Sequence, residues 1–140
     1  GVSNFDLEDM QELLETPGGR NCQANQVLYH LGSRGIEVAL KPWQDQQQIP
    51  TIAYCPLAQA GALQRDLIQH PAVQQTAAEL GISVYQVLLC FTLAQSNMVS
   101  IARGWWVVQA TACYPTHRQN RAYERNCRLF DHSLERRTAG

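Results

Sequence analysis

The chain has no run of about 18 or more consecutive apolar residues, which is the length that one helix needs to cross a bilayer. Its first residues also lack the basic, apolar and small segments of a signal peptide. Hydrophobic residues make up 45% of the sequence and charged residues only 16%, a composition that can bury a core and is unlike that of disordered chains. The 140 residues therefore predict one domain and no membrane span.

The sequence also lacks the motifs that mark common cofactor and metal sites. It contains no CxxC, GxGxxG, Walker loop, HExxH or GxSxG. The four histidines have no ligand spacing, so we expect no metal site. The five cysteines are odd in number and far apart, which argues against a disulfide framework and suits a reducing cytoplasm: Cys22, Cys55, Cys90, Cys113 and Cys127.

Charge divides the sequence into two parts. Residues 1–103 contain five Lys/Arg and nine Asp/Glu, a net charge of −4, whereas residues 104–140 contain six Arg and three acids, a net charge of +3. Such an asymmetry indicates either a basic tail for an acidic partner or a tail of different origin. Three net charges over 37 residues are too few for a strong nucleic-acid footprint, so we expect no nucleic-acid partner.

Residues 1–103 alternate between strand and helix patterns. Polar caps at Ser3, Asn4 or Asp6 precede an apolar stripe that predicts a helix ending near residue 16. Further on, the sequence predicts strands at 23–30, 49–57 and 98–102 and helices at 42–47, 71–80 and 84–95. The helix ends are marked by Pro42 and Pro71 at first positions, by Gly81 after the helix at 71–80, and by a capping box at Ser83. We expect the helix at 84–95 to be deeply buried, because it is apolar almost all round. This order predicts an α/β fold with a parallel sheet, and either an open doubly wound sheet or part of a (β/α)8 barrel fits it.

Three stretches of polar and aromatic residues are expected at strand ends, at 3–4, 25–26 and 53–57. Functional side chains of parallel α/β folds sit at the carboxyl ends of strands. Ser, Asn and Gln there can hydrogen-bond a planar amide, and Tyr54 can offer a ring face. The structural alternatives are a helix cap for Ser3 and Asn4, loop hydrogen bonding for Gln26 and core packing for Tyr54.

Four segments occur in an order and spacing that resemble the second half of a bacterial aldo-keto reductase: "GVSNF" (1–5), "NQVLYH" (25–30), "AYCPLAQAG" (53–61) and "GISVYQVLL" (81–89). The resemblance covers about residues 1–103. It implies the C-terminal portion of a (β/α)8 TIM barrel, in a family that binds NADPH at the carboxyl face of its strands. It also implies reduction of aldehydes and ketones to alcohols by hydride transfer.

The resemblance assigns cofactor contacts to seven residues: Ser3, Asn4, Gln26, Tyr54, Cys55, Leu57 and Arg103. The first three would hold the nicotinamide carboxamide, and Tyr54 would stack on the ring. Cys55 and Leu57 would lie along the pyrophosphate. Arg103, in "IARG" where the family has "IPKS" or "IPKA", would replace the lysine that pairs with the 2′-phosphate of NADP.

The family's catalytic tyrosine, lysine, histidine and aspartate lie upstream of "GVSNF", so the resemblance assigns no catalytic residue to this chain. We therefore expect a fragment, inactive alone, whose tail at 104–140 follows a frameshift near residues 101–104 or is a divergent native tail. A part-barrel leaves sheet edges and an apolar face open, which predicts self-association. The alternative to a piece of an NAD(P)H-dependent reductase of small-molecule carbonyls is a non-catalytic cofactor-binding or half-barrel pairing module.

Overall fold

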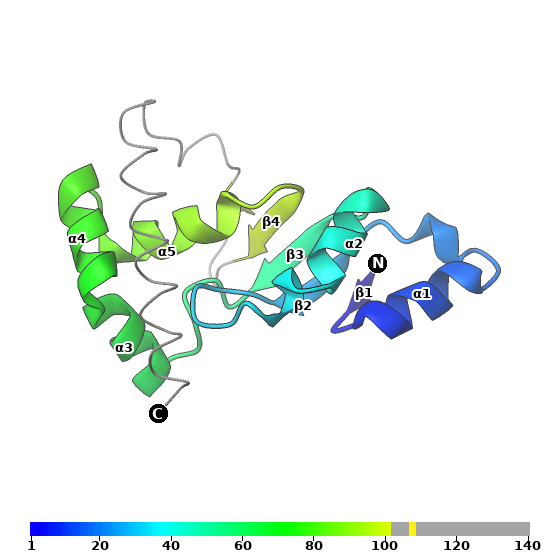
Figure 1. Cartoon of the computed structure of the whole chain (residues 1–140), viewed down its shortest axis with the longest axis horizontal. Helices are drawn as coiled ribbons and strands as arrows, with labels where there is room; N and C mark the ends of the chain where they lie inside the picture. The colour runs from blue at the N-terminus through cyan, green and yellow to red at the C-terminus, as the bar shows by residue number, and fades with distance from the viewer. Residues whose placement is uncertain (102–106, 109–140) are drawn as a thin grey trace.

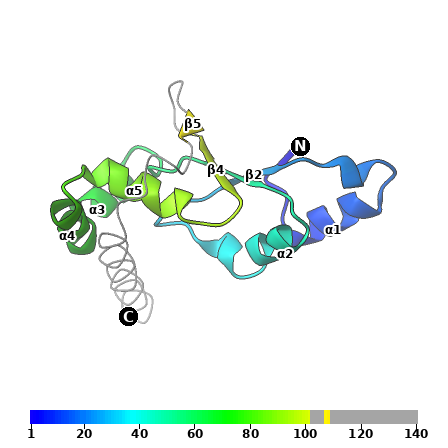
Figure 2. The same cartoon turned by 90° about the horizontal axis from the view of Figure 1, so that it is seen from above.

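Four parallel strands lie side by side in chain order in the computed structural model, which describes residues 1–101 and 107–108. They are β1 (Val2–Ser3), β2 (Asn25–Leu28), β3 (Thr51–Tyr54) and β4 (Met98–Ile101) (Figure 1). A further strand, β5 (Val107–Val108), adds an antiparallel pair to β4 (Figure 2). An open doubly wound sheet reverses its strand order at a switch point. The order here does not reverse. Of the two predicted architectures, it therefore indicates part of a barrel. The antiparallel β5 was not predicted.

Five α-helices connect these strands: α1 (Leu7–Glu15), α2 (Leu40–Gln46), α3 (Ala62–Gln69), α4 (Pro71–Leu80) and α5 (Val84–Leu93). There are also two short 3-10 turns among the described residues. The first, η1 (Gly19–Asn21), lies between α1 and β2, and the second, η2 (Gly35–Glu37), lies between β2 and α2. The arrangement is elongated, with α1 at one end and α3 and α4 at the other (Figure 1). In the view turned by 90°, α1 and α2 lie to one side of β2 (Figure 2).

Most helix ends follow the predicted capping signals. Asp6 caps α1 in a reciprocal box with Asp9, and Ser83 caps α5 in the same way with Gln86. Pro71 is the first residue of α4, and Gly81 ends that helix at φ 65°, a conformation that glycine adopts without strain. The prediction that Pro42 opens its helix was wrong, because α2 begins two residues earlier, at Leu40.

Helix α3 was not predicted, and its local sequence explains why. Gly61 precedes it without a side-chain cap, and Leu67 is its one buried residue. No start signal therefore marks it, and its apolar pair, Leu63 and Leu67 one turn apart, is too short a pattern to predict a helix by itself. The expectation that α5 is buried all round was also too strong, because the exposed fraction of Tyr85 is 45% while Leu88 is fully buried.

The sheet is buried on one face and half-exposed on the other. Alternate strand residues are buried beneath the helices: Asn25, Val27, Thr51, Ala53, Met98 and Ser100. The residues between them are half-buried or exposed: Gln26, Leu28, Ile52, Tyr54 and Val99. Within the described residues, only one face of the apolar strand β3 is covered. In a closed barrel the second face is the interior, which the opposite strands and their side chains fill.

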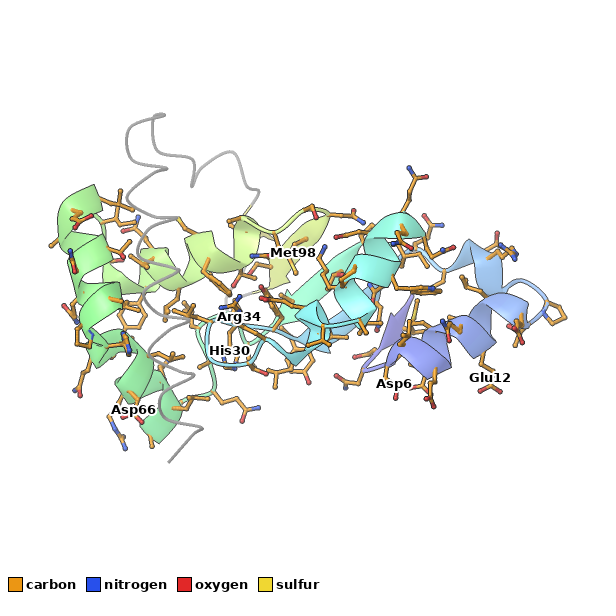
Figure 3. All side chains as sticks on the ribbon, in the orientation of Figure 1. Asp6, Glu12, His30, Arg34, Asp66 and Met98 are labelled. Carbon is orange, nitrogen blue, oxygen red and sulfur yellow. The ribbon has the colours of Figure 1, made fainter. Side chains whose placement is uncertain are left out.

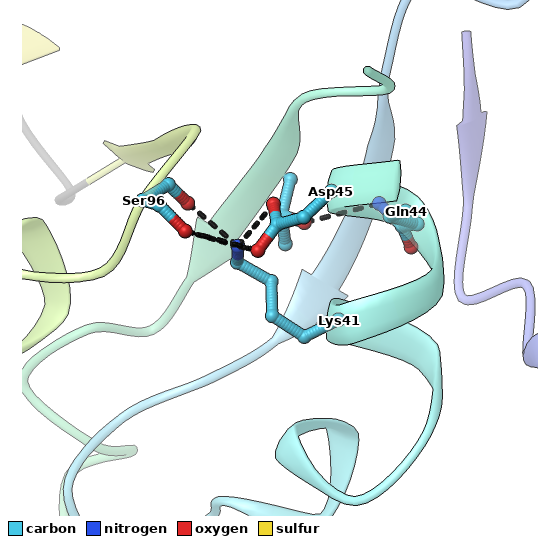
Figure 4. Close-up of polar contacts among 5 residues, drawn as sticks. Lys41, Gln44, Asp45 and Ser96 are labelled. Atoms are coloured by element: carbon cyan, nitrogen blue, oxygen red, sulfur yellow. Dashed lines mark hydrogen bonds and ion pairs between the residues drawn. The ribbon is translucent and has the colours of Figure 1, made fainter. Parts of the chain in front are cut away.

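A buried polar network joins α2 to the amino ends of the strands (Figure 4). Gln44, which is fully buried, donates to Thr51 Oγ1 (3.0 Å) and accepts from Asn25 Nδ2 (3.1 Å). Lys41 Nζ contacts both carboxylate oxygens of Asp45 at 2.5 Å and the Ser96 carbonyl at 2.6 Å. The functional face of a barrel lies at the opposite, carboxyl ends of its strands. We therefore assign this network a structural role.

The end of α2 offers a test of backbone strain. Gln48 adopts φ 57°, its N–H donates to the Asp45 carbonyl, and the Ile49 N–H donates to the Gln44 carbonyl, which together form a Schellman motif. Gln48→Gly is expected to raise the free energy of unfolding by about 0.5–1 kcal/mol, because a non-glycine residue pays to adopt this conformation. Urea denaturation measures it. The matched Gln47→Gly, at a right-handed position (φ −80°), should lower stability, and equal effects of the two would contradict the assignment.

Candidate functional site

Four of the seven predicted site residues lie together on β1–β3: Ser3 and Asn4 at the carboxyl end of β1, Tyr54 at that of β3, and Gln26 at the second position of β2, beside Ser3. Ser3 and Gln26 are register partners on adjacent strands and therefore point to the same face of the sheet. The Ser3 hydroxyl donates to the Gln26 carbonyl at 3.1 Å, and the Asn4 N–H donates to the same carbonyl at 2.8 Å. The Tyr54 hydroxyl donates to Asn4 Oδ1 at 2.9 Å, so β3 is tied to the end of β1 across β2.

The structural alternatives for these residues do not hold in the described chain. Asp6 caps α1, because its Oδ1 accepts from the Asp9 N–H at 2.9 Å, so Ser3 and Asn4 are not helix caps. Gln26 lies within β2 rather than in a loop. Tyr54 is half-buried and belongs to neither hydrophobic cluster of the core.

The donors and acceptors of this group suit a planar carboxamide. Within residues 1–101, the side-chain amide of Gln26 and the Nδ2 group of Asn4 have no hydrogen-bond partner. A carboxamide presents one acceptor oxygen and one NH2 group, and amide and hydroxyl side chains can satisfy both. The half-exposed ring of Tyr54 adds an aromatic face at the same edge of the sheet. The residues present therefore fit the nicotinamide end of the cofactor that the resemblance implies.

The remaining predicted residues lie further along the chain. Cys55 and Leu57 lie in a tight turn after β3, in which the Ala58 N–H donates to the Cys55 carbonyl at 2.8 Å. Cys55 and Ala58 both adopt positive φ, at 53° and 62°, and the Leu57 carbonyl accepts from Gln64 Nε2 at 3.0 Å. Arg103 lies outside the described residues. The roles of all three along the phosphates stay predictions.

A second polar cluster follows β2, in the loop that leads to α2 (Figure 3). The Tyr29 hydroxyl donates to Glu37 Oε1 at 2.6 Å, and Arg34 pairs with the same carboxylate at 2.7 Å. The Arg34 guanidinium also lies 5.3 Å from the ring centre of Phe91, on which Tyr29 stacks. Burial alone would raise the pKa of Glu37, but the hydrogen bonds from Arg34 and Tyr29 and the Arg34 charge lower it overall. Burial lowers the pKa of His30, whose Nδ1 accepts from the Gly32 N–H.

These two shifts predict that stability falls on acidification in two steps. Since the pKa of His30 is lowered in the folded state, the unfolded chain takes up the proton first as pH falls through 6.5, and stability is lost below that pH. The pKa of Glu37 is likewise lowered in the folded state. The unfolded chain therefore takes up this proton first as pH falls through 4.5, and stability is lost below that pH. The melting temperature, measured from pH 8 to 4, checks this. His30→Asn should flatten the upper step alone, and an unchanged upper step would contradict the role of His30.

The described residues contain neither a metal-binding cluster nor a helix of membrane-spanning length. No group of three or more His, Cys, Asp or Glu within residues 1–101 is placed to hold a metal ion. No single helix there is long and apolar enough to span a membrane. Helices α4 and α5 reach that length only together, and the pair is bent by 93°.

Individual proteins of one family resemble the chain in sequence and in structure. No protein-family model, however, matches the chain. Over 104 residues, which are 74% of this chain and 37% of the relative, the sequence is 52% identical to methylglyoxal reductase YeaE of Escherichia coli strain K12. An aldo/keto reductase from Klebsiella pneumoniae, solved in complex with NADP and acetate, is 43% identical with a TM-score of 0.75 over 89% of this chain and 46% of that one.

A more distant neighbour shows the same fold. The thermostable aldo-keto reductase Tm1743, solved with the inhibitor epalrestat, is 24% identical with a TM-score of 0.66, covering 90% of this chain and 47% of that one. The chain thus spans less than half the length of each of these relatives. In sequence and in fold, the chain belongs to the aldo-keto reductase family and corresponds to the C-terminal portion of its (β/α)8 barrel.

Proposed function

We propose that this chain carries the nicotinamide-binding part of an NADP-dependent aldo-keto reductase. The observation that carries the proposal is the convergence of Ser3, Asn4 and Tyr54, at the carboxyl ends of β1 and β3, with Gln26 of the strand between them. The Klebsiella pneumoniae neighbour was solved with NADP and with NADPH, which supports this cofactor.

Each residue of the group has a separate task in this proposal. Ser3, Asn4 and Gln26 hold the carboxamide and so fix the rotation of the ring about its glycosidic bond. The Tyr54 ring lies against one face of the nicotinamide and leaves the other for the carbonyl substrate. When bound, the reduced nicotinamide supplies a hydride to the carbonyl carbon. Cys55, Leu57 and Arg103 would hold the phosphates.

We further propose that the chain alone binds the cofactor without turnover. The resemblance assigns the catalytic tyrosine, lysine, histidine and aspartate to positions with no counterpart among these 140 residues. The Escherichia coli relative is a methylglyoxal reductase, so a small carbonyl compound of that kind is the first substrate to test on a complete reductase that contains this sequence. We also propose that the reductase portion of the chain ends near residue 103. The tail at 104–140 would then follow a frameshift or be a divergent native tail.

Calorimetric titration of the 140-residue chain with NADPH tests the function. Gln26→Ala removes an amide from the site, and Gln23→Ala removes the same group from an exposed residue that precedes β2. We expect saturable binding by the native chain and by Gln23→Ala, with about a fivefold loss in Gln26→Ala, since one hydrogen bond contributes about 1 kcal/mol. No binding by the native chain, or equal loss in both variants, would contradict the proposal.

A second candidate function is pairing with a complementary half-barrel. Two observations favour it: β1 has no neighbour on its outer edge among the described strands, and Leu28, Ile52 and Val99 are left part-exposed on the uncovered face. Light scattering across a concentration series tests the prediction of self-association. A monomer that stays monodisperse at every concentration would exclude pairing with a second copy.

A further inference from the structure

We infer that the Tyr54 hydroxyl is a positioning group that fixes the orientation of the Asn4 side-chain amide towards the cofactor. This inference deepens the proposed function and rests on it. The established resemblance gives Tyr54 only a stacking ring, whereas the hydroxyl of that ring donates to Asn4 Oδ1 at 2.9 Å.

In the observed orientation, the bond leaves the donor end of the Asn4 amide available. An asparagine amide has an acceptor oxygen at one end and an NH2 donor at the other, and a rotation of about 180° exchanges them. Because the hydroxyl engages Oδ1, the Nδ2 group is left to donate. Within residues 1–101 it has no partner of its own. A carboxamide oxygen needs a donor of this kind, and an oxygen facing it would repel it.

The backbone of Asn4 is held as firmly as its side chain. Asn4 adopts φ 58°, a left-handed conformation that asparagine tolerates better than most residues. Its N–H donates to the Gln26 carbonyl at 2.8 Å, which anchors the residue to β2. With the backbone fixed by β2, the side chain keeps only its own rotations, and the hydroxyl from β3 restricts those.

The same bond also fixes the aromatic ring. Tyr54 is the last residue of β3, beyond which the chain turns at Cys55 with φ 53°. The ring is half-buried, so packing alone does not hold it on every side. One hydrogen bond therefore orients both the amide and the ring that would contact a single nicotinamide, before any cofactor is bound.

Tyr54→Phe tests the inference, because it keeps the ring and removes only the hydroxyl. Tyr85→Phe is the matched control, since Tyr85 is an exposed tyrosine on α5. We expect NADPH to bind Tyr54→Phe roughly 3- to 10-fold more weakly than the native chain, the effect of one lost hydrogen bond. Binding of 2′,5′-ADP, which lacks the nicotinamide, should not change. Equal weakening for both ligands would mark a merely structural effect and overturn the inference, as would unchanged NADPH binding.

A measurement without cofactor separates this inference from the proposed function. The side-chain NH2 resonances of Asn4, observed by NMR in the cofactor-free chain, should shift in Tyr54→Phe and stay in place in Tyr85→Phe. If they do not move in Tyr54→Phe, the positioning role is wrong whether or not the chain binds NADPH. If they move but the native chain does not bind NADPH, the proposed function fails and the positioning role towards a cofactor fails with it.

Discussion

Asp45→Ala should lower the free energy of unfolding by about 3 kcal/mol, because it leaves a buried ammonium group without its counter-charge. The side chain of Lys41 is only 6% exposed, and both carboxylate oxygens of Asp45 lie 2.5 Å from Nζ. After the substitution only Ser96 still contacts Nζ, through its carbonyl at 2.6 Å and its hydroxyl at 3.5 Å. Neutral oxygens at these distances cannot offset the cost of a buried charge.

The partner substitution gives the contrast that tests this reasoning. Lys41→Met removes the charge and keeps a long apolar stem, while Asp45, whose side chain is 30% exposed, retains a hydrogen bond from the Ser96 hydroxyl at 2.9 Å. We expect Lys41→Met to cost about 1 kcal/mol or less. Urea denaturation of both variants measures the difference. Equal losses would mean that the pair is stabilised as an exposed ion pair rather than as a buried one.

Leu88→Ala is expected to cost about 3 kcal/mol, since it opens a cavity at a fully buried position of α5. Leu88 belongs to the larger hydrophobic cluster, which joins α4 and α5 to β3 and to the loop after β2. The surrounding side chains come from several elements, so they cannot all collapse into the space that is left.

Leu63→Ala provides the same chemical change at an exposed position. The exposed fraction of Leu63 on α3 is 46%, so its truncation removes little buried surface. We expect a loss below about 1 kcal/mol. Thermal and urea denaturation should therefore rank the native chain and Leu63→Ala close together and Leu88→Ala far below. A small effect of Leu88→Ala would show that the core of this part-barrel is loosely packed.

Local chemistry explains which parts of the fold the sequence could predict. Asp6, Pro71 and Ser83 mark helix starts by contacts within one turn, so the printed sequence is enough to find them. Helix α3 has no such cap, and the pairing of β5 with β4 depends on contacts between strands. Neither is marked by a local capping signal.

The candidate site divides in the same way. The position of Ser3, Asn4 and Tyr54 at strand ends could be predicted from the alternation of strands and helices, whereas Gln26 lies at the second position of β2. The bond between Tyr54 and Asn4 could not, because 50 residues separate the two in the chain and only the folded sheet brings them together. The left-handed backbone of Asn4 is likewise set by its bond to β2.

In the proposed function, Ser3, Asn4, Gln26 and Tyr54 of β1–β3 form a nicotinamide site, and mapping NADPH binding by backbone amide NMR tests that site. NADPH should shift the amide resonances of Ser3, Asn4, Gln26 and Cys55. Thr51 and Met98, at the amino ends of β3 and β4, should stay in place. Shifts confined to Thr51 and Met98, or none at saturating NADPH, would rule the site out.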